Sequence, residues 1–99
     1  MHKNIFWSPL AEKDLTEILL YLQNNWGEKV TDRFIDLTEY YIQQTSQNPR
    51  QFPLIHKTKK IRKCVLTKHN SLFYRTSKFN IDILRIFDTR QNPKKLKFQ

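Results

Sequence analysis

Two apolar stripes with helical spacing follow one another in the first half of the chain, and both need a surface to cover them. The first stripe steps by four, three and four residues through Ala11, Leu15, Ile18 and Leu22, with Leu19 and Trp26 alongside. The second stripe repeats these steps through Val30, Phe34, Leu37 and Tyr41. The pattern predicts two antiparallel helices that place both stripes in a core, so we assign these side chains no chemistry.

The ends of the two helices can be read from local signals. Ser8 can cap the first helix and Pro9 suits its first position, and the acidic residues of the first turns favour the positive end of the helix dipole. This helix should run to about Asn25. The only glycine, Gly27, follows where a C-cap needs positive φ. The second helix should begin at about Glu28 and stop before Pro49.

Strand signals precede and follow the helices. Residues 3–7 alternate, with Ile5 and Trp7 on one face, and predict a first strand at an edge of the sheet. Residues 48–60 contain two prolines and predict a loop that also holds His56. Three further strands are expected at Ile61–Leu66, Leu72–Ser77 and Ile81–Asp88, the last one central because both of its faces are apolar. The whole chain, 1–99, is therefore expected to be one α+β domain of order β-α-α-β-β-β, with the first strand and the helical hairpin packed on a twisted antiparallel sheet.

Charge is divided sharply between the two halves of the chain. Residues 1–49 hold four basic and seven acidic residues, a balance of −3, whereas residues 50–99 hold fourteen basic and two acidic residues, a balance of +12. Such a field favours a nucleic acid or an acidic partner chain. Two basic clusters stand out: the loop lysines Lys57, Lys59, Lys60 and Lys63 beside Arg62, and the tail lysines Lys94, Lys95 and Lys97. For both clusters the alternative is a solvated surface, and for the tail a frayed terminus.

Several classes of protein are disfavoured by what the sequence lacks. One glycine excludes a glycine-rich phosphate loop, and no apolar run is long enough to suggest a membrane span. The single cysteine, Cys64, is interpreted as a buried or half-buried strand residue and not as a nucleophile, and it fits a reducing cytoplasm. The three histidines and the cysteine lack the spacing of metal ligands, so no metal and no cofactor are expected.

The ordered motifs resemble a known family. The segment "FWSPLAEKDLTEILLYLQNNWGE" is followed by "NPRQFP", "IRK", "LFYR" and "ILRIFDTRQNP". Together, from Ile5 to about Leu96, they resemble the RelE/ParE superfamily of bacterial type II toxins. The resemblance implies a small α+β toxin of a plasmid-stabilisation type that arrests growth. It also implies an acidic, partly disordered antitoxin from the same operon, which holds the toxin silent and through which oligomers form.

The superfamily contains two activities. RelE-like members are ribosome-dependent mRNA endoribonucleases, whereas ParE-like members bind DNA gyrase and trap it on cleaved DNA. Of the RNase positions that the resemblance implies, Arg62 and Arg90 are present, while Cys64, Ser71 and Leu96 replace the expected basic and aromatic residues. If the chain is an RNase, His69 and Tyr74 are the remaining candidates for proton transfer.

The incomplete set, together with the helical hairpin, favours gyrase as the target. The residues expected to bind that target are Arg62, Arg90, Lys94, Lys95 and Lys97. The loop lysines form a second patch that could meet nucleic acid or the antitoxin. A non-toxic binding module of the same fold is a further alternative.

Arg85 stands apart from these candidates because it lies within a strand with two apolar faces. Alternation places it on the face of Ile83 and Phe87, with Leu84 and Ile86 opposite. We expect the guanidinium to be paired, with Asp82 or Asp88 as the partner, or to lie over the core with its head in water.

Overall fold

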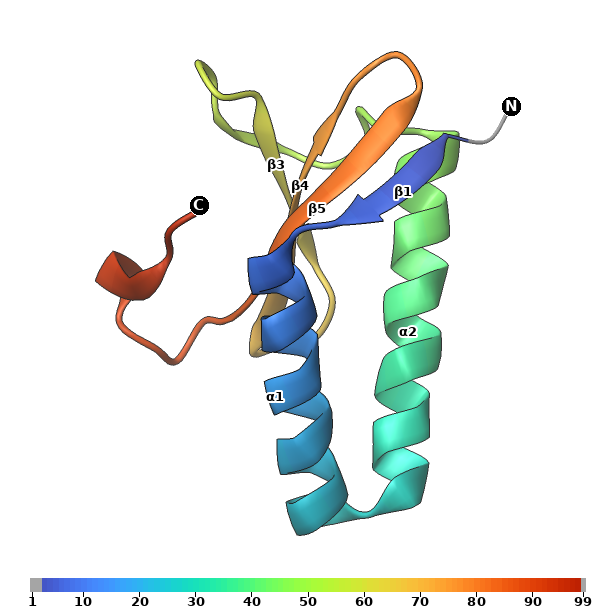
Figure 1. The fold of residues 1–99 in the computed structure, drawn as a ribbon, viewed down its shortest axis with the longest axis vertical. Coiled ribbons are helices and arrows are strands. Elements are labelled where there is room, and N and C mark those ends of the chain that lie inside the picture. Colours follow the sequence, from blue (N-terminus) through green and yellow to red (C-terminus); the bar gives the residue numbers. More distant parts are fainter. Residues whose placement is uncertain (1–2, 99) are drawn as a thin grey trace.

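The computed structural model describes residues 3–98, in which a long helical hairpin packs against one five-stranded sheet (Figure 1). The elements are β1 (Asn4–Trp7), α1 (Pro9–Trp26), α2 (Glu28–Gln47), β2 (Leu54–His56), β3 (Ile61–Val65), β4 (Asn70–Thr76), β5 (Asn80–Asp88) and the short 3-10 helix η1 (Pro93–Lys95). The α+β architecture and the position of both helices confirm the prediction.

Local chemistry explains the helix ends. The hydroxyl of Ser8 accepts a hydrogen bond from Ala11 N at 3.0 Å and donates one to Leu84 O at 2.7 Å. The cap therefore also ties the start of α1 to β5. Gly27 has φ +89°, which lets the chain leave α1 and enter α2 within one residue.

The strand order is β1-β5-β4-β3-β2, so β1 is an edge strand and β5 is an interior strand with a neighbour on each side, as predicted from its two apolar faces. The pairing of β1 with β5 is parallel, however, which makes the sheet mixed and corrects the expected antiparallel sheet. The other pairings are antiparallel. Both helices and three strands separate β1 from β5 in the sequence. No tight turn links the two strands, so they can pair in parallel.

The loop predicted for residues 48–60 contains the additional strand β2. Leu54 pairs with Arg62, and His56 pairs with Ile61 across an irregular register. His56 is therefore on a strand and not in a loop. All three residues of β2 are exposed, so the apolar alternation that reveals a strand is missing here.

A bulge in β5 changes which side chains face the helices. Phe73 pairs with Arg85 and Tyr74 pairs with Ile83, which leaves Leu84 as the extra residue. Ile83 therefore shares the helix-facing core with Ile86, whereas Leu84 joins Phe87 on the opposite face. The predicted alternation is wrong for Ile83 and Leu84, because the extra residue reverses the phase of the strand.

The two faces of the sheet carry two apolar clusters. The hairpin covers the larger one, which includes the buried stripe residues Ala11 and Phe34. On the face without helices, the buried residues are Ile61, Phe73, Leu84 and Phe87, and Leu96 and Phe98 of the C-terminal tail pack on them. The tail is thus a folded segment and not a frayed one (Figure 1).

The hairpin is longer than the sheet that it covers, and its far end projects beyond the strands (Figure 1). Trp26 is accordingly 65% exposed, although its place beside the first stripe predicted a core position. Leu20 and Tyr21, on the last turns of α1, are also exposed. No helix among the described residues is both long and apolar enough to cross a membrane.

Candidate functional site

The start of the candidate site is the edge of β5 beyond the point where β1 ends. The last pair of β1 joins Trp7 to Ile83, and α1 then runs beside the rest of β5. Asp14 of α1 accepts a hydrogen bond from Ile86 N at 3.1 Å, which satisfies a backbone donor of this uncovered edge. Helix α1 thus covers the part of the β5 edge that β1 does not pair with.

Asp14 also binds Arg85 through both carboxylate oxygens. The Arg85 Nε–Asp14 Oδ2 distance is 2.7 Å and the Nη2–Oδ1 distance is 3.0 Å. The hydrogen bonds and the charge of Asp14 raise the pKa of Arg85 above its ordinary value. The partner of Arg85 is therefore on α1, and neither Asp82 nor Asp88 fills the role predicted for them. We call Asp14 and Arg85 the inner pair.

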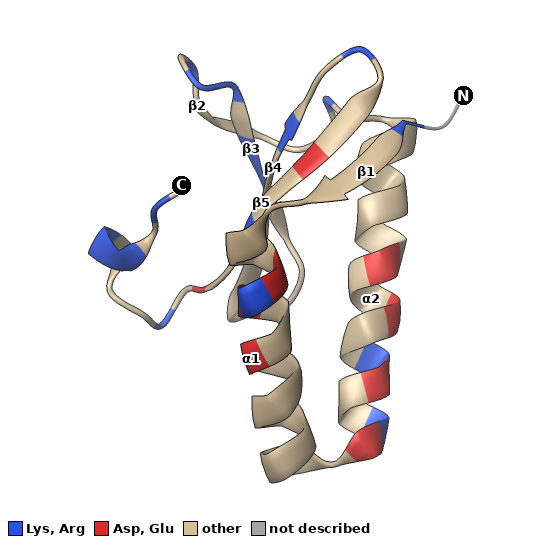
Figure 2. Ribbon diagram, in the orientation of Figure 1, with Lys and Arg blue, Asp and Glu red and all other residues tan. Residues whose placement is uncertain are grey.

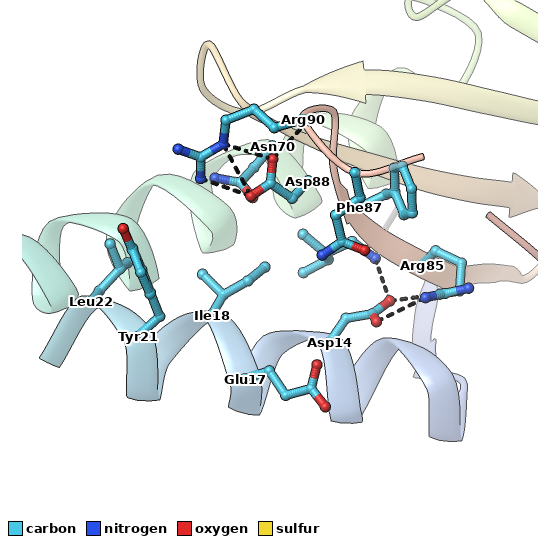
Figure 3. Close-up of a pocket in the computed structure, with 12 residues that line it drawn as sticks. Asp14, Glu17, Ile18, Tyr21, Leu22, Asn70, Arg85, Phe87, Asp88 and Arg90 are labelled. Atoms are coloured by element: carbon cyan, nitrogen blue, oxygen red, sulfur yellow. Dashed lines mark hydrogen bonds and ion pairs between the residues drawn. The ribbon is translucent and has the colours of Figure 1, made fainter. Parts of the chain in front are cut away.

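A groove begins beside this pair and continues towards the tip of the hairpin (Figure 3). Its first part, about 400 Å³, lies between α1 and the end of β5. Its second part, about 450 Å³, lies between the end of α1, the start of α2 and the β3–β4 loop. The two parts share Tyr21, Leu22, Asn70 and Arg90. We call the two parts together the hairpin groove.

Arg90 lies where the two parts of the groove meet, and Asp88 fixes its side chain. The Arg90 Nη2–Asp88 Oδ2 distance is 2.7 Å, and Arg90 N also donates to Asp88 Oδ1 at 2.9 Å. This hydrogen bonding holds the pKa of the Asp88 carboxyl below its ordinary value. The Arg90 side chain is 55% exposed, so its guanidinium is oriented and remains accessible. We call Asp88 and Arg90 the outer pair.

The β3–β4 loop is tied to the same segment. Thr89 N donates to His69 O at 2.7 Å, and the Thr89 hydroxyl donates to the same oxygen at 3.2 Å. His69 lies in this loop and lines the second part of the groove together with Arg90. The structure therefore brings these two predicted residues to one surface.

The far wall of the groove combines aromatic and cationic side chains. Tyr21 is 51% exposed and Trp26 is 65% exposed, and Arg33 of α2 lies on the same wall. Among the described residues, no Asp or Glu lines this second part of the groove. Exposed rings next to guanidinium groups suit a partner that offers both an apolar and an anionic group.

Arg62, the other predicted arginine, lies away from this groove. It donates through Nη1 to Phe52 O at 2.7 Å and so holds the segment before β2. Arg62 pairs with Tyr74 across the strands, whereas Asn70, which lines the groove with Arg90, is four residues earlier, at the start of β4. Four residues of a strand span roughly 13 Å. Arg62 and Arg90 therefore do not reach the same small group.

Tyr74 and Cys64 are core residues. Tyr74 is fully buried, and its hydroxyl donates to Pro49 O at 2.7 Å. Burial raises the pKa of Tyr74 to about 12 and that of Cys64 to about 11. The predicted buried position of Cys64 is confirmed. Within residues 3–98, no group of three or more His, Cys, Asp or Glu side chains could hold a metal ion.

The tail lysines lie on the opposite side of the sheet from the hairpin. Lys94 and Lys95 are in η1, and Lys97 O accepts a hydrogen bond from Arg85 Nη1 at 2.6 Å. The inner pair thus also holds the tail. The predicted target-binding set is therefore divided between the hairpin groove, the β3 strand and the tail.

Sequence reasoning missed Asp14, Tyr21 and Asn70 as parts of the site. Tyr21 left a signal, because it is a large aromatic residue outside the apolar stripe of α1. Asp14 left none beyond its place near a helix start, since its partner Arg85 is 71 residues away. Asn70 is near the end of a loop, where a polar residue is ordinary.

Comparisons with known proteins agree with the fold. The sequence model of the family described as ParE toxin of type II toxin-antitoxin system, parDE, matches residues 5–93. A chain of the chromosomal ParDE TA system from P. aeruginosa is 19% identical, with a TM-score of 0.72, over 88% of this chain and 96% of that one. No curated protein matches the sequence.

Two other solved structures share the fold at lower identity. A chain of the E. coli DinJ-YafQ toxin-antitoxin complex is 14% identical, with a TM-score of 0.63, over 91% of this chain and 96% of that one. The YoeB/ParE toxin from Agrobacterium tumefaciens is 13% identical, with a TM-score of 0.63, over 86% of this chain and 96% of that one. At these identities the likeness concerns the fold alone.

Proposed function

Because this chain belongs to the ParE toxin family of type II toxin-antitoxin systems, we propose that it arrests bacterial growth by inhibiting DNA gyrase. We choose gyrase over RNA as the target because the groups that RNA cleavage would need lie apart from one another. A metal-free nuclease must bring a base, an acid and cations within hydrogen-bond reach of one phosphate.

The candidate groups for RNA cleavage are spread over separate places. Arg62 is bound to the segment before β2, and Arg90 lies beyond the end of β5. Tyr74 is in the core with its hydroxyl bonded to Pro49 O, so a substrate could not reach it without opening the core. This distribution supports a binding protein over a nuclease.

The hairpin groove suits a protein target. Tyr, Trp and Arg are the side chains that dominate protein–protein interfaces, because they combine large area with directed polar groups. In the groove, exposed Tyr21 and Trp26 lie beside Arg33 and Arg90. We therefore assign Arg90 the role of an anchor for an acidic group of the target.

One observation favours the second candidate function, a ribosome-dependent mRNA endoribonuclease. His69 and Arg90 line the same groove, and Thr89 joins their segments through two hydrogen bonds. In that case His69 would transfer the proton and Arg90 would stabilise the charge on the phosphate.

A cognate antitoxin in the cytoplasm is the further partner that we propose. The family is defined by paired toxins and antitoxins, and the DinJ-YafQ structure is such a complex. The net charge of +9 favours an acidic antitoxin through long-range attraction. Assembly through the antitoxin would then set the oligomeric state.

The test uses purified gyrase and programmed ribosomes in parallel. With gyrase, ATP and plasmid, the chain should block supercoiling and accumulate cleaved plasmid, and Arg90→Ala should do so about tenfold less well, because a charged hydrogen bond to the target is lost. Lys29→Ala, an exposed cation outside the groove, is the matched control. Cleavage of ribosome-bound mRNA that is lost in His69→Ala, with gyrase unaffected, would select the second function.

A further inference from the structure

Most carboxylates and most cations of this chain occupy different layers of the fold, because seven of the nine acidic residues lie in the first half and fourteen of the eighteen basic residues lie in the second half. All seven acidic residues of the first half lie on α1 and α2. Between Glu39 and Asp82 the sequence has nine Lys and Arg residues and no Asp or Glu. This basic stretch forms β2, β3, β4 and their loops, and in Figure 2 the connection between β2 and β3 lies away from the acidic helices.

The folded tail brings the two basic clusters of the sequence to one side of the sheet. Phe98 packs against Phe73 with ring centroids 5.6 Å apart, and Phe73 pairs across the strands with Lys63. The tail and the β2–β3 hairpin lie on the same side of the molecule in Figure 2. We call this surface the lysine face; its cations are Lys57, Lys59, Lys60, Lys63, Lys94, Lys95 and Lys97.

Among residues 3–98, no lysine of the lysine face takes part in an ion pair. The three ion pairs found among residues 3–98 all use arginines. Six of the seven lysines are exposed, and Lys63 is half-buried. Lysines that repel one another without a carboxylate nearby gain from an external polyanion, because each phosphate contact also releases condensed counterions.

The turn that carries three of these lysines has a fixed backbone. Lys59 N donates to His56 Nδ1 at 3.1 Å across the turn. Lys60 has φ +56°, the left-handed conformation that favours glycine or asparagine over a lysine. The chain thus places a charged side chain where a smaller residue would be less strained.

We propose that the lysine face binds the phosphate backbone of duplex DNA. Single strands are usually held on exposed aromatic rings, but the rings beside these lysines, Phe73 and Phe98, pack on each other, and Phe73 is only 4% exposed. Cations with so little accessible ring surface from Phe73 suit a duplex, whose bases are already stacked. Such contacts position a protein on DNA without reading its sequence. This inference goes beyond the proposed function, because it needs neither gyrase nor Arg90.

The test is the salt dependence of binding to a short labelled duplex, measured by fluorescence anisotropy with the isolated full chain. Each lysine that contacts a phosphate contributes about 0.9 to the slope of log K against log salt. The double variant Lys57→Ala/Lys59→Ala should therefore lower the slope by about 1.8, and so should Lys95→Ala/Lys97→Ala.

Two controls distinguish an effect of the lysine face on binding from an effect of net charge and from an effect on folding. Lys13→Ala/Lys29→Ala removes the same charge from the helices and should leave the slope unchanged. Lys60→Gly should raise the thermal midpoint, because the turn is relaxed, and still weaken binding, because a cation is lost.

Three results would overturn the proposal: no duplex binding at low salt, an equal loss of slope in the helix variant, or tighter binding of single-stranded RNA than of the duplex. The gyrase assay is read separately. Duplex binding without gyrase inhibition would contradict only the proposed function. Gyrase inhibition without duplex binding would contradict only the proposal that the lysine face binds DNA.

Discussion

The inner pair, Asp14–Arg85, and the outer pair, Asp88–Arg90, both lie at the end of β5, and each has a shortest N–O distance of 2.7 Å. The inner side chains are only 13% and 12% exposed and come from residues 71 positions apart. The outer side chains are 55% and 21% exposed and come from residues two positions apart. The inner pair joins three segments of the fold, whereas the outer pair joins nothing beyond its own turn.

The difference decides what each pair can contribute. A buried ion pair leaves an uncompensated charge when one partner is removed, so its loss is expensive for the fold. An exposed pair is screened by water and contributes little to stability, but it keeps a guanidinium oriented for a partner. We therefore assign the inner pair to the structure and propose that the outer pair serves binding. The predictions below are ordered by their expected effect on the free energy of unfolding.

The largest effect is expected for Asp14→Ala. The variant leaves the buried charge of Arg85 without its partner and also removes the acceptor of Ile86 N. We therefore expect a loss of about 3 kcal/mol in the free energy of unfolding. Urea unfolding of the purified chain measures it. Asp14→Asn is the control, since it keeps an acceptor and should cost less. A loss below about 1 kcal/mol for Asp14→Ala would contradict the structural role of the pair.

Release of the tail should have the next largest effect. Phe98→Ala removes half-buried apolar contacts with Phe73, and we expect a loss of about 1 to 2 kcal/mol, less than for a fully buried ring. Trypsin should also cut faster at the tail lysines. Phe79→Ala, whose ring is 61% exposed, should change neither quantity. Tail cleavage at the wild-type rate in Phe98→Ala would show that the tail is held by other contacts.

The part of the fold that sequence could predict is the part with strong periodicity. The two helices, their ends at Ser8 and Gly27, and the central position of β5 follow from apolar spacing and capping chemistry. β2 could not be predicted, because its three residues are exposed on both faces. The bulge at Leu84 was hidden because β5 is apolar on both faces, so a shift in phase leaves no trace in the sequence.

The site was less predictable because it depends on contacts between distant residues. Arg90 could be proposed from its place after the last strand, and the structure puts it on an open groove. The partner of Arg85 could not be identified, since Asp82 and Asp88 are nearer in sequence than Asp14. The fold of the tail had one signal, the apolar residues Leu96 and Phe98 among lysines, but charge dominated its interpretation.

A smaller effect on stability is expected for Asp88→Asn, and it should depend on pH. Arg90 lowers the pKa of the folded Asp88 carboxyl below the unfolded value of about 3.9. Its contribution is therefore fully present above about pH 4 and is lost as the pH falls through the folded pKa. The difference between wild type and Asp88→Asn in urea midpoint should be constant at neutral pH and shrink in acid. A difference that grows in acid would contradict this assignment.

Arg90→Ala should lower the urea midpoint no more than Asp88→Asn does, because it removes the same exposed pair. The same variant should need about tenfold more expression to arrest growth, since it removes the proposed anchor for the target. Growth curves at matched expression measure this, with Lys29→Ala as the control. Full growth arrest by Arg90→Ala at the wild-type level would remove the outer pair from the binding surface.

The central claim, that this toxin uses the outer pair to bind gyrase, is tested most directly by pulse labelling after induction in a bacterial host. Thymidine and amino-acid incorporation are followed together for the wild type and for Arg90→Ala. We predict that thymidine incorporation fails first and the DNA-damage response rises, and that Arg90→Ala delays both. Collapse of amino-acid incorporation within the first samples, while DNA synthesis continues, would contradict the account and point to mRNA cleavage in the groove of His69 and Arg90.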